Sequence, residues 1–342
     1  MYELNIKTGN GCESQVVVGE SYRNLDRYLP EGKQIVIITD SNVRRHYGFF
    51  LDAFPVIEIG TGEQHKTIRT LEHLYWELLR LNIDRNGFVV AVGGGIVCDV
   101  AGYAASTFMR GIPFGFVSTS LLSQVDASVG GKNGVNFGGY KNMIGTFNQP
   151  RFVICDPQML RTLPVEEFIS GFAEIVKAAA IRDAELFAYL ERNAEKALDG
   201  DPEVLLHLVS KSVKIKAQVV ERDEREQGER RILNFGHTFG HAIEVLSGMS
   251  HGKAVSAGMM IAARWSSEIC GLPNDQVQRL EELLSGLKLP VAADIAADEL
   301  FRAAVKDKKR ENDAIHMVLL NAIGSAEICR LPIDDIRKRL EG

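Results

Sequence analysis

Short apolar runs alternate with amphipathic stretches along the first half of the chain. The runs QIVIIT (34–39), VIEIG (56–60), FVVAVG (88–93), FGFVS (114–118) and RFVIC (151–155) are typical of buried strands. Between them, residues 65–81 and 99–109 repeat apolar side chains at helical spacing. This alternation predicts a Rossmann-like α/β fold, with a mostly parallel sheet covered by helices.

The pattern changes after Pro157. Helical periodicity runs through residues 166–192, 202–222, 230–247, 252–270, 274–287 and 332–341, with one short strand pair at 316–320 and 326–329. We therefore expect an α/β nucleotide-binding domain over residues 1–160 and a mainly α-helical domain over residues 161–342.

Composition limits the possible partners. The chain has 342 residues, with 45% hydrophobic and 25% charged residues and a net charge of -6. This is ordinary globular usage, and it indicates neither nucleic acid nor membrane as a partner, although local basic clusters could hold a small phosphorylated substrate. The chain start lacks the features of a signal peptide, and the five cysteines are far apart in sequence. We expect reduced thiols and a cytoplasmic location.

The segment GGGIVCD (93–99) follows an expected strand and opens an expected helix. Consecutive glycines let a backbone approach a phosphate, and a helix start offers free N–H donors. The usual dinucleotide fingerprint would place glycine where Cys98 stands, so this stretch alone could equally be a tight turn.

A second glycine-rich stretch, VGGKNGVNFGGYKNMIG (129–145), contains Lys132 and Lys141. We interpret it as a loop that contacts a phosphate or carboxylate ligand, rather than as a flexible surface loop. Two further segments, TDSNV (39–43) and TGEQHK (61–66), follow expected strands, where open α/β sheets bind ligands. Asp40, Asn42, Glu63 and Lys66 could reach a nucleotide there, or serve as turn and helix-cap residues.

Five polar residues in the segment 230–247 are separated by alternating steps of four and three residues: Arg230, Asn234, His237, His241 and Glu244. On one continuous helix they would form a single stripe between apolar flanks. A solvated helix face usually carries Lys and Glu pairs, so the stripe favours a functional site. Any single histidine could still be a hydrogen-bonded core residue.

A metal centre is one interpretation of these histidines. Catalytic zinc uses three protein ligands and keeps one position open. Glu174 lies in the apolar helix FAEIVKAAA (172–180), where a buried carboxylate needs a cation. That cation could be a metal ion, or it could be the ammonium group of Lys177, one turn later. The spacing in sequence does not distinguish between the two.

The motifs taken in order resemble the 3-dehydroquinate synthase family of sugar-phosphate cyclases, from about residue 34 to 325. They are TGEQHK, GGGIVCDVAGYAASTFMRG, STSLLSQVDASVGGKNG, GYKNMIG, LPVEEFISGFAEIVK, ERRILNFGHTFGHAIE and SHGKAVSAGM. The chain departs from the family pattern at Asn133, where threonine is usual, at Lys253, where glutamate is usual, and at STS (118–120) in place of PTT. None of these changes removes a metal ligand.

The resemblance implies an active site between an NAD-binding domain and a helical domain. It implies one Zn²⁺ or Co²⁺ held by Glu174, His237 and His251, with His241 handling protons at the substrate. The substrate contacts it implies are Arg110, Asp126, Lys132, Asn142, Lys177, Lys216, Arg230 and Asn234, and Lys308 and Lys309 are further candidates for the phosphate.

The cofactor contacts that the resemblance implies fall on the expected strand ends and glycine segments. They are Asp40, Asn42, Thr61, Gly62, Glu63, Gln64, His65, Lys66, Gly95, Ile96, Val97, Cys98, Asp99, Thr119, Ser120, Lys132, Lys141, Met159, Leu160, Arg161 and Thr162.

The implied activity is that of a homodimeric lyase of the shikimate pathway. It converts 3-deoxy-D-arabino-heptulosonate 7-phosphate to 3-dehydroquinate by transient oxidation with NAD⁺, phosphate elimination, re-reduction and aldol closure, so NAD⁺ is regenerated. Two alternatives are another cyclase, of the 2-deoxy-scyllo-inosose or valiolone type, and a metal-dependent glycerol or glycerol-phosphate dehydrogenase of similar fold.

Overall fold

The computed structural model describes residues 1–7, 11, 13–307 and 313–341. The chain divides into two compact units, which are described separately. The first unit is Met1–Pro164 with Lys216–Arg225, and the second is Val165–Ile215 with Glu226–Gly342. In the described part of the chain, no helix is both long and apolar enough to span a bilayer.

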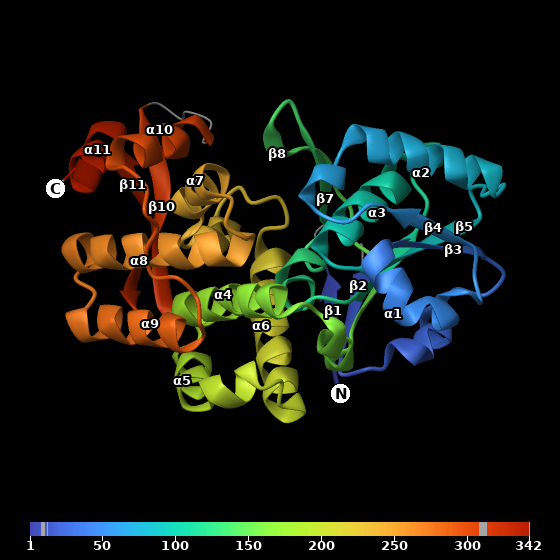
Figure 1. Cartoon of the computed structure of the whole chain (residues 1–342), viewed down its shortest axis with the longest axis horizontal. Coiled ribbons are helices and arrows are strands. Elements are labelled where there is room, and N and C mark those ends of the chain that lie inside the picture. Colours follow the sequence, from blue (N-terminus) through green and yellow to red (C-terminus); the bar gives the residue numbers. More distant parts are fainter. Residues whose placement is uncertain (8–10, 12, 308–312, 342) are drawn as a thin grey trace. The chain divides into compact units, whose positions relative to one another are not determined.

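A seven-stranded sheet forms the centre of the first unit (Figure 1), with strand order β1-β2-β9-β6-β5-β3-β4. All neighbours are parallel except the pair β1 and β2. The strands are β1 (Tyr2–Lys7), β2 (Glu13–Val18), β3 (Gln34–Asp40), β4 (Val56–Ile59), β5 (Gly87–Gly93), β6 (Phe114–Ser118) and β9 (Phe152–Cys155). The expected strands are present, and β1 and β2 extend the sheet beyond them.

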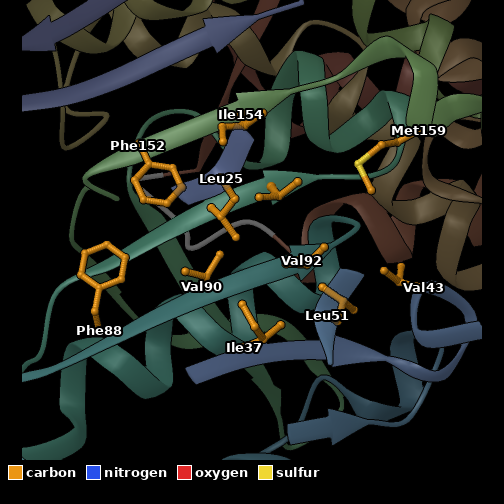
Figure 2. Close-up of a cluster of buried hydrophobic side chains, with 11 residues drawn as sticks. Leu25, Ile37, Val43, Leu51, Phe88, Val90, Val92, Phe152, Ile154 and Met159 are labelled. Carbon is orange, nitrogen blue, oxygen red and sulfur yellow. The ribbon is translucent and has the colours of Figure 1, made fainter. Parts of the chain in front are cut away.

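Helices cover both faces of this sheet, which explains why β5, β6 and β9 are buried at every position. On one face, Phe88, Val90 and Val92 of β5 belong to a buried cluster with side chains from neighbouring strands and from α1 (Ser41–Leu51), as Figure 2 shows. The intervening residues of β5 are equally buried, and α3 (Gly95–Thr107) packs against that strand. The unit also contains α2 (Ile68–Arg80).

The glycine-rich stretch that we expected to be a loop forms an antiparallel hairpin, β7 (Lys132–Phe137) and β8 (Tyr140–Phe147), and its contact with a ligand stays a prediction. Its turn is made by Gly138 and Gly139, with φ of 60° and 81°. Two successive residues with positive φ give the turn type whose twist matches that of paired strands. The glycines at this turn therefore serve hairpin geometry.

The second unit consists of helices with one antiparallel strand pair, β10 (Ala314–Ala322) and β11 (Ser325–Pro332). Its helices are α4 (Val165–Arg182), α5 (Ala184–Leu198), the first part of α6 (Pro202–Arg222), α7 (His237–Ser247), α8 (His251–Cys270), α9 (Asn274–Gly286), α10 (Ala297–Asp307) and α11 (Ile333–Glu341). The helix α10 was not expected from the sequence.

Two expected helices are interrupted. The stretch 166–192 divides at Asp183, whose side chain caps the start of α5 by accepting from the N–H of Leu186. The stretch 230–247 divides into a 3₁₀ segment (Glu229–Asn234) and α7, because Gly236 adopts φ of 79°. The prediction of a single polar stripe from Arg230 to Glu244 was therefore wrong, because only His237, His241 and Glu244 share a helix.

Glycines set the close approach of the helices around the histidines. A Cβ atom on Gly258 of α8 would lie 2.1 Å from the carbonyl oxygen of Gly236, at the start of α7. A Cβ on Gly252 would lie 1.9 Å from the carbonyl oxygen of Ser170 in α4. Larger residues at Gly258 or Gly252 would force these helices apart, and so these glycines position the residues at the starts of α7 and α8.

Candidate active site

Three side chains from three helices of the second unit converge on one point. Glu174 comes from α4, His237 begins α7 and His251 begins α8. The Nε2 atoms of His237 and His251 lie 3.6 and 3.5 Å from Oε1 of Glu174. One ligand atom from each residue lies within 4.8 Å of the other two.

These separations suit a tetrahedral metal. Zinc binds nitrogen and oxygen at about 2.0–2.1 Å, so two ligands in tetrahedral geometry lie about 3.3 Å apart. The Glu174 carboxylate is nearly inaccessible, and its Oε1 has no hydrogen-bond partner among the described residues. A buried acceptor left in this state costs free energy, which a cation would recover. The donor set of one carboxylate and two imidazoles fits Zn²⁺ or Co²⁺.

The second nitrogen of each imidazole faces an acceptor. Nδ1 of His237 lies 3.2 Å from the backbone oxygen of Phe235, and Nδ1 of His251 lies 3.3 Å from Oε2 of Glu244. A hydrogen on each Nδ1 would leave both Nε2 lone pairs directed at the Glu174 side of the site. Such outer contacts orient metal-binding histidines in proteins.

The electrostatics of the site depend on burial and on Lys177, which pairs with Oε2 of Glu174. Burial opposes the charge of Glu174, but Lys177 and the two histidines outweigh it and hold the pKa of this carboxyl well below its usual range. Burial and the Lys177 ammonium hold the pKa of His237 well below its usual range. Burial also opposes the charge of His251, but Glu174 and Glu244 raise its pKa to about 9.

The ion pair with Lys177 and a metal ion can therefore coexist, because they use different oxygens of the Glu174 carboxylate. Lys177 occupies the Oε2 side of the carboxylate, whereas both imidazoles face Oε1. His241 stands apart from this group. Its ring centroid is 5.3 Å from that of His237 and 6.1 Å from that of His251, on the next turn of α7.

The glycine turn GGGIVCD in the first unit lies at the topological switch point of the sheet, where successive strands are added on opposite sides of β3. The chain passes from β3 outward to β4 and returns to β5 on the other side of β3, and open α/β sheets bind ligands at such a point. β5 ends at Gly93, Gly94 caps α3, and Gly95 begins that helix. A Cβ on Gly94 would meet nothing closer than Oγ of Ser120, at 3.3 Å.

The segment TGEQHK meets this turn directly, because Lys66 pairs with Asp99 in the first turns of α3. Glu63 accepts a hydrogen bond of 2.8 Å from Asn136 and lies 3.9 Å from Lys141. These contacts bring three of the implied cofactor segments together. Gln64 bonds back to the carbonyl oxygen of Thr61 within its own segment.

Several implied cofactor residues have local structural roles. Asp40 caps α1 by accepting from the N–H groups of Asn42 and Val43, at 2.9 and 3.0 Å. Among the implied cofactor residues, some are buried: Val97, Cys98, Thr119, Met159 and Leu160. Others are exposed (Gly62, Arg161 and Thr162) or of intermediate exposure (Gly95, Ile96, His65 and Ser120).

The implied substrate residues in the first unit fall into two groups. Lys216 binds Asp126 at 2.6 Å, and Asp126 lies in a short π-helical turn (Ser123–Ala127). The other three are exposed: Lys132 and Asn142 lie on the hairpin, and Arg110 precedes Gly111. The backbone of Arg110 itself has a φ of 71°. A left-handed residue such as Arg110 carries backbone strain, which is often found at functional positions.

In the second unit, Arg230 is only 2% exposed and Asn234 donates to Glu226 at 2.6 Å. Both lie in the 3₁₀ segment before α7. Lys308 and Lys309 lie outside the described residues. The sequence placed Glu244 in the polar stripe but did not predict its contact with His251, and it gave no signal for Glu226 or Asn136.

The chain matches two family models that are adjacent along the sequence. The model described as 3-dehydroquinate synthase N-terminal matches residues 56–170, and the one described as 3-dehydroquinate synthase C-terminal matches residues 171–310. A 3-dehydroquinate synthase from Geobacter metallireducens is 43% identical over 89% of this chain and 88% of its own length. One from Dehalococcoides mccartyi is 43% identical over 93% of both chains.

Solved structures with the same fold include other cyclases. A 2-deoxy-scyllo-inosose synthase in complex with carbaglucose-6-phosphate, NAD⁺ and Co²⁺ is 28% identical, with a TM-score of 0.88 over 100% of both chains. A 2-epi-5-epi-valiolone synthase from Streptomyces hygroscopicus with NAD⁺ and Zn²⁺ is 28% identical, with a TM-score of 0.87 over 95% of both chains.

Proposed function

The chain belongs to the 3-dehydroquinate synthase family, and we propose that it converts 3-deoxy-D-arabino-heptulosonate 7-phosphate to 3-dehydroquinate and phosphate. The observation that carries the proposal is the convergence of Glu174, His237 and His251 around an oxygen without a hydrogen-bond partner in the described chain. These side chains would hold a divalent metal, and a related cyclase has been solved with NAD⁺ and Zn²⁺ bound.

When bound, Zn²⁺ or Co²⁺ would polarise a substrate hydroxyl, and NAD⁺ would accept and return a hydride. Glu174, His237 and His251 hold the metal. The glycine turn at Gly94 and Gly95 holds the dinucleotide, with residues 1–160 forming the NAD-binding domain and residues 161–342 the metal- and substrate-binding domain.

Basic side chains bind the phosphate that leaves. Lys177, Lys216 and Arg230 are all nearly buried, so each must face an anion or a hydrogen-bond acceptor. In the absence of substrate, Lys177 pairs with Glu174 and Lys216 pairs with Asp126. Arg110 and Lys132 are exposed and add positive charge. Positive side chains of this kind stabilise the charge that accumulates on a departing phosphate.

His241 holds or transfers the proton of the substrate hydroxyl that is oxidised. It lies one helical turn from His237 but outside the three-ligand group. An imidazole can both donate and accept a proton at its ring nitrogens, which suits an acid–base role. Asn142, Asn234 and Asp126 orient hydroxyl groups of the substrate.

A second cyclase activity is supported by one observation, the TM-score of 0.88 to the 2-deoxy-scyllo-inosose synthase. We favour the dehydroquinate activity because the relatives of that name are 43% identical. A probable glycerol dehydrogenase with TM-score 0.67 is 14% identical and shares the fold alone.

One assay decides among these functions. The purified enzyme is given the heptulosonate phosphate, or a hexose 6-phosphate as the matched control, with NAD⁺ and metal omitted in turn. We expect phosphate release and dehydroquinate only from the heptulosonate phosphate, only with both cofactors, and without NADH accumulation. Turnover of the hexose phosphate alone, or stoichiometric NADH, would overturn the assignment.

We further infer a cytoplasmic homodimer, which the family resemblance supports. Sedimentation equilibrium should give twice the chain mass of 37.8 kDa. A monomer at micromolar concentration would contradict it.

A further inference from the structure

Two cysteines and a carboxylate meet at a second place in the second unit, separate from the Glu174 site. Cys270 is the last residue of α8, and Glu327 and Cys329 lie on one face of β11. The two Sγ atoms are 3.9 Å apart, and Sγ of Cys329 lies 3.8 Å from Oε1 of Glu327. One ligand atom from each residue lies within 4.8 Å of the other two.

The sulfur separation matches that of two thiolates on one metal. Zinc binds thiolate sulfur at about 2.3 Å, so two sulfurs in tetrahedral geometry lie about 3.8 Å apart. A disulfide would require about 2.05 Å and therefore a movement of both side chains. The observed 3.9 Å between Cys270 and Cys329 needs almost no movement to accept an ion.

The surroundings favour a cation. Cys270 ends a helix of 20 residues, whose last carbonyl groups carry partial negative charge. Among the described residues, we find no lysine or arginine paired with Glu327. A divalent ion would offset the charge of the Glu327 carboxylate and the partial negative charge at the end of α8.

We propose that Cys270, Glu327 and Cys329 form a second metal site, for a thiophilic divalent cation of the zinc class. The ion takes two sulfurs, one carboxylate oxygen and a water molecule in tetrahedral coordination. Each thiol releases its proton to solvent as its sulfur binds, so occupancy rises with pH. The site ties the end of α8 to β11, and it does not depend on the proposed catalytic function.

Cobalt distinguishes this site from the catalytic one, because the Glu174 site contains no sulfur. The probe is Co²⁺ alone, added to the metal-free, full-length enzyme under a reductant that does not bind metal. We expect two cobalt ions per chain and a thiolate-to-cobalt charge-transfer absorption equivalent to one of them. Cys270→Ser and Cys329→Ser should each abolish the absorption and reduce the stoichiometry to one ion, while dehydroquinate formation is retained.

Matched controls exclude general damage. Cys155→Ala removes a thiol from the first unit and should leave the absorption unchanged. Glu327→Gln should weaken cobalt binding about 10-fold or more, whereas Glu268→Gln, on an α8 carboxylate that pairs with Arg339, should not. Binding of Co²⁺ should also raise the melting temperature of a His237→Ala variant, which lacks the catalytic metal.

Three results would overturn the proposal. The first is one cobalt ion per chain without charge-transfer absorption. The second is an absorption that survives in both cysteine variants. The third is loss of the two thiols as a disulfide when the reductant is removed, together with no cobalt absorption when it is present.

Discussion

Nδ1 of His251 lies 3.3 Å from Oε2 of Glu244, although seven residues and the end of a helix separate them in the chain. The carboxylate holds the ring with its Nε2 atom towards Glu174. Glu244 is thus a positioning residue that acts on the metal through an imidazole.

Glu244→Ala should weaken metal binding about 10- to 100-fold, the usual effect of removing an outer partner of a metal-binding histidine. Competition with a chromogenic chelator measures the Kd. Glu244→Gln keeps an acceptor and should lose less. If both variants bind metal like the parent, Glu244 does not orient His251.

Alanine at Glu174, His237 or His251 should lower the metal content and abolish turnover, because a site with two remaining ligands holds zinc poorly. Elemental analysis after dialysis gives the occupancy. Glu167→Ala, on the same helix as Glu174 but exposed, is the matched control. Full catalytic-site occupancy in all three ligand variants would refute the assignment.

His241→Ala should retain metal and NAD⁺ but lose roughly 10²–10⁴ in rate, the usual range for an acid–base group. If His241→Ala loses its metal while His251→Ala keeps it, the two roles have been exchanged.

Gly94→Val should prevent NAD⁺ binding, because a side chain there would occupy the space next to the phosphate-binding N–H groups of α3. The fold should survive, since a Cβ on Gly94 meets only Ser120, at 3.3 Å. Gly48→Val in α1, where the nearest atom is 3.9 Å away, is the control. Calorimetry that finds unaltered NAD⁺ affinity in Gly94→Val would place the cofactor elsewhere.

The buried thiol of Cys155 makes stability depend on pH. Burial raises its pKa in the folded protein above the value of about 8.5 expected in the unfolded chain. The unfolded chain alone then releases this proton, so stability is complete below about pH 8.5 and falls by up to about 1.4 kcal/mol per pH unit above it. Urea midpoints between about pH 7.5 and 10 should decrease less steeply in Cys155→Ala. Equal slopes in parent and variant would contradict this account.

The local pattern of apolar and polar residues was sufficient to predict the central strands of the sheet and one long helix. Apolar runs predicted β3, β5 and β6, and helical spacing predicted α6 at residues 202–222, where the structure has it. Local sequence predicts these elements because burial on both faces of a sheet, or on one face of a helix, determines which neighbouring positions are apolar. The ordered motifs also determined the family.

Only the tertiary structure decided which side chains meet. The interruption at Gly236 depends on its backbone conformation and on its packing against α8, neither of which periodicity encodes. The glycines of residues 129–145 are equally compatible with a loop and with the observed hairpin. Cys270 and Cys329 are 59 residues apart, and their sulfurs become neighbours only when β11 folds beside the end of α8. Such contacts depend on the three-dimensional path of the chain, to which spacing in sequence contributes almost nothing.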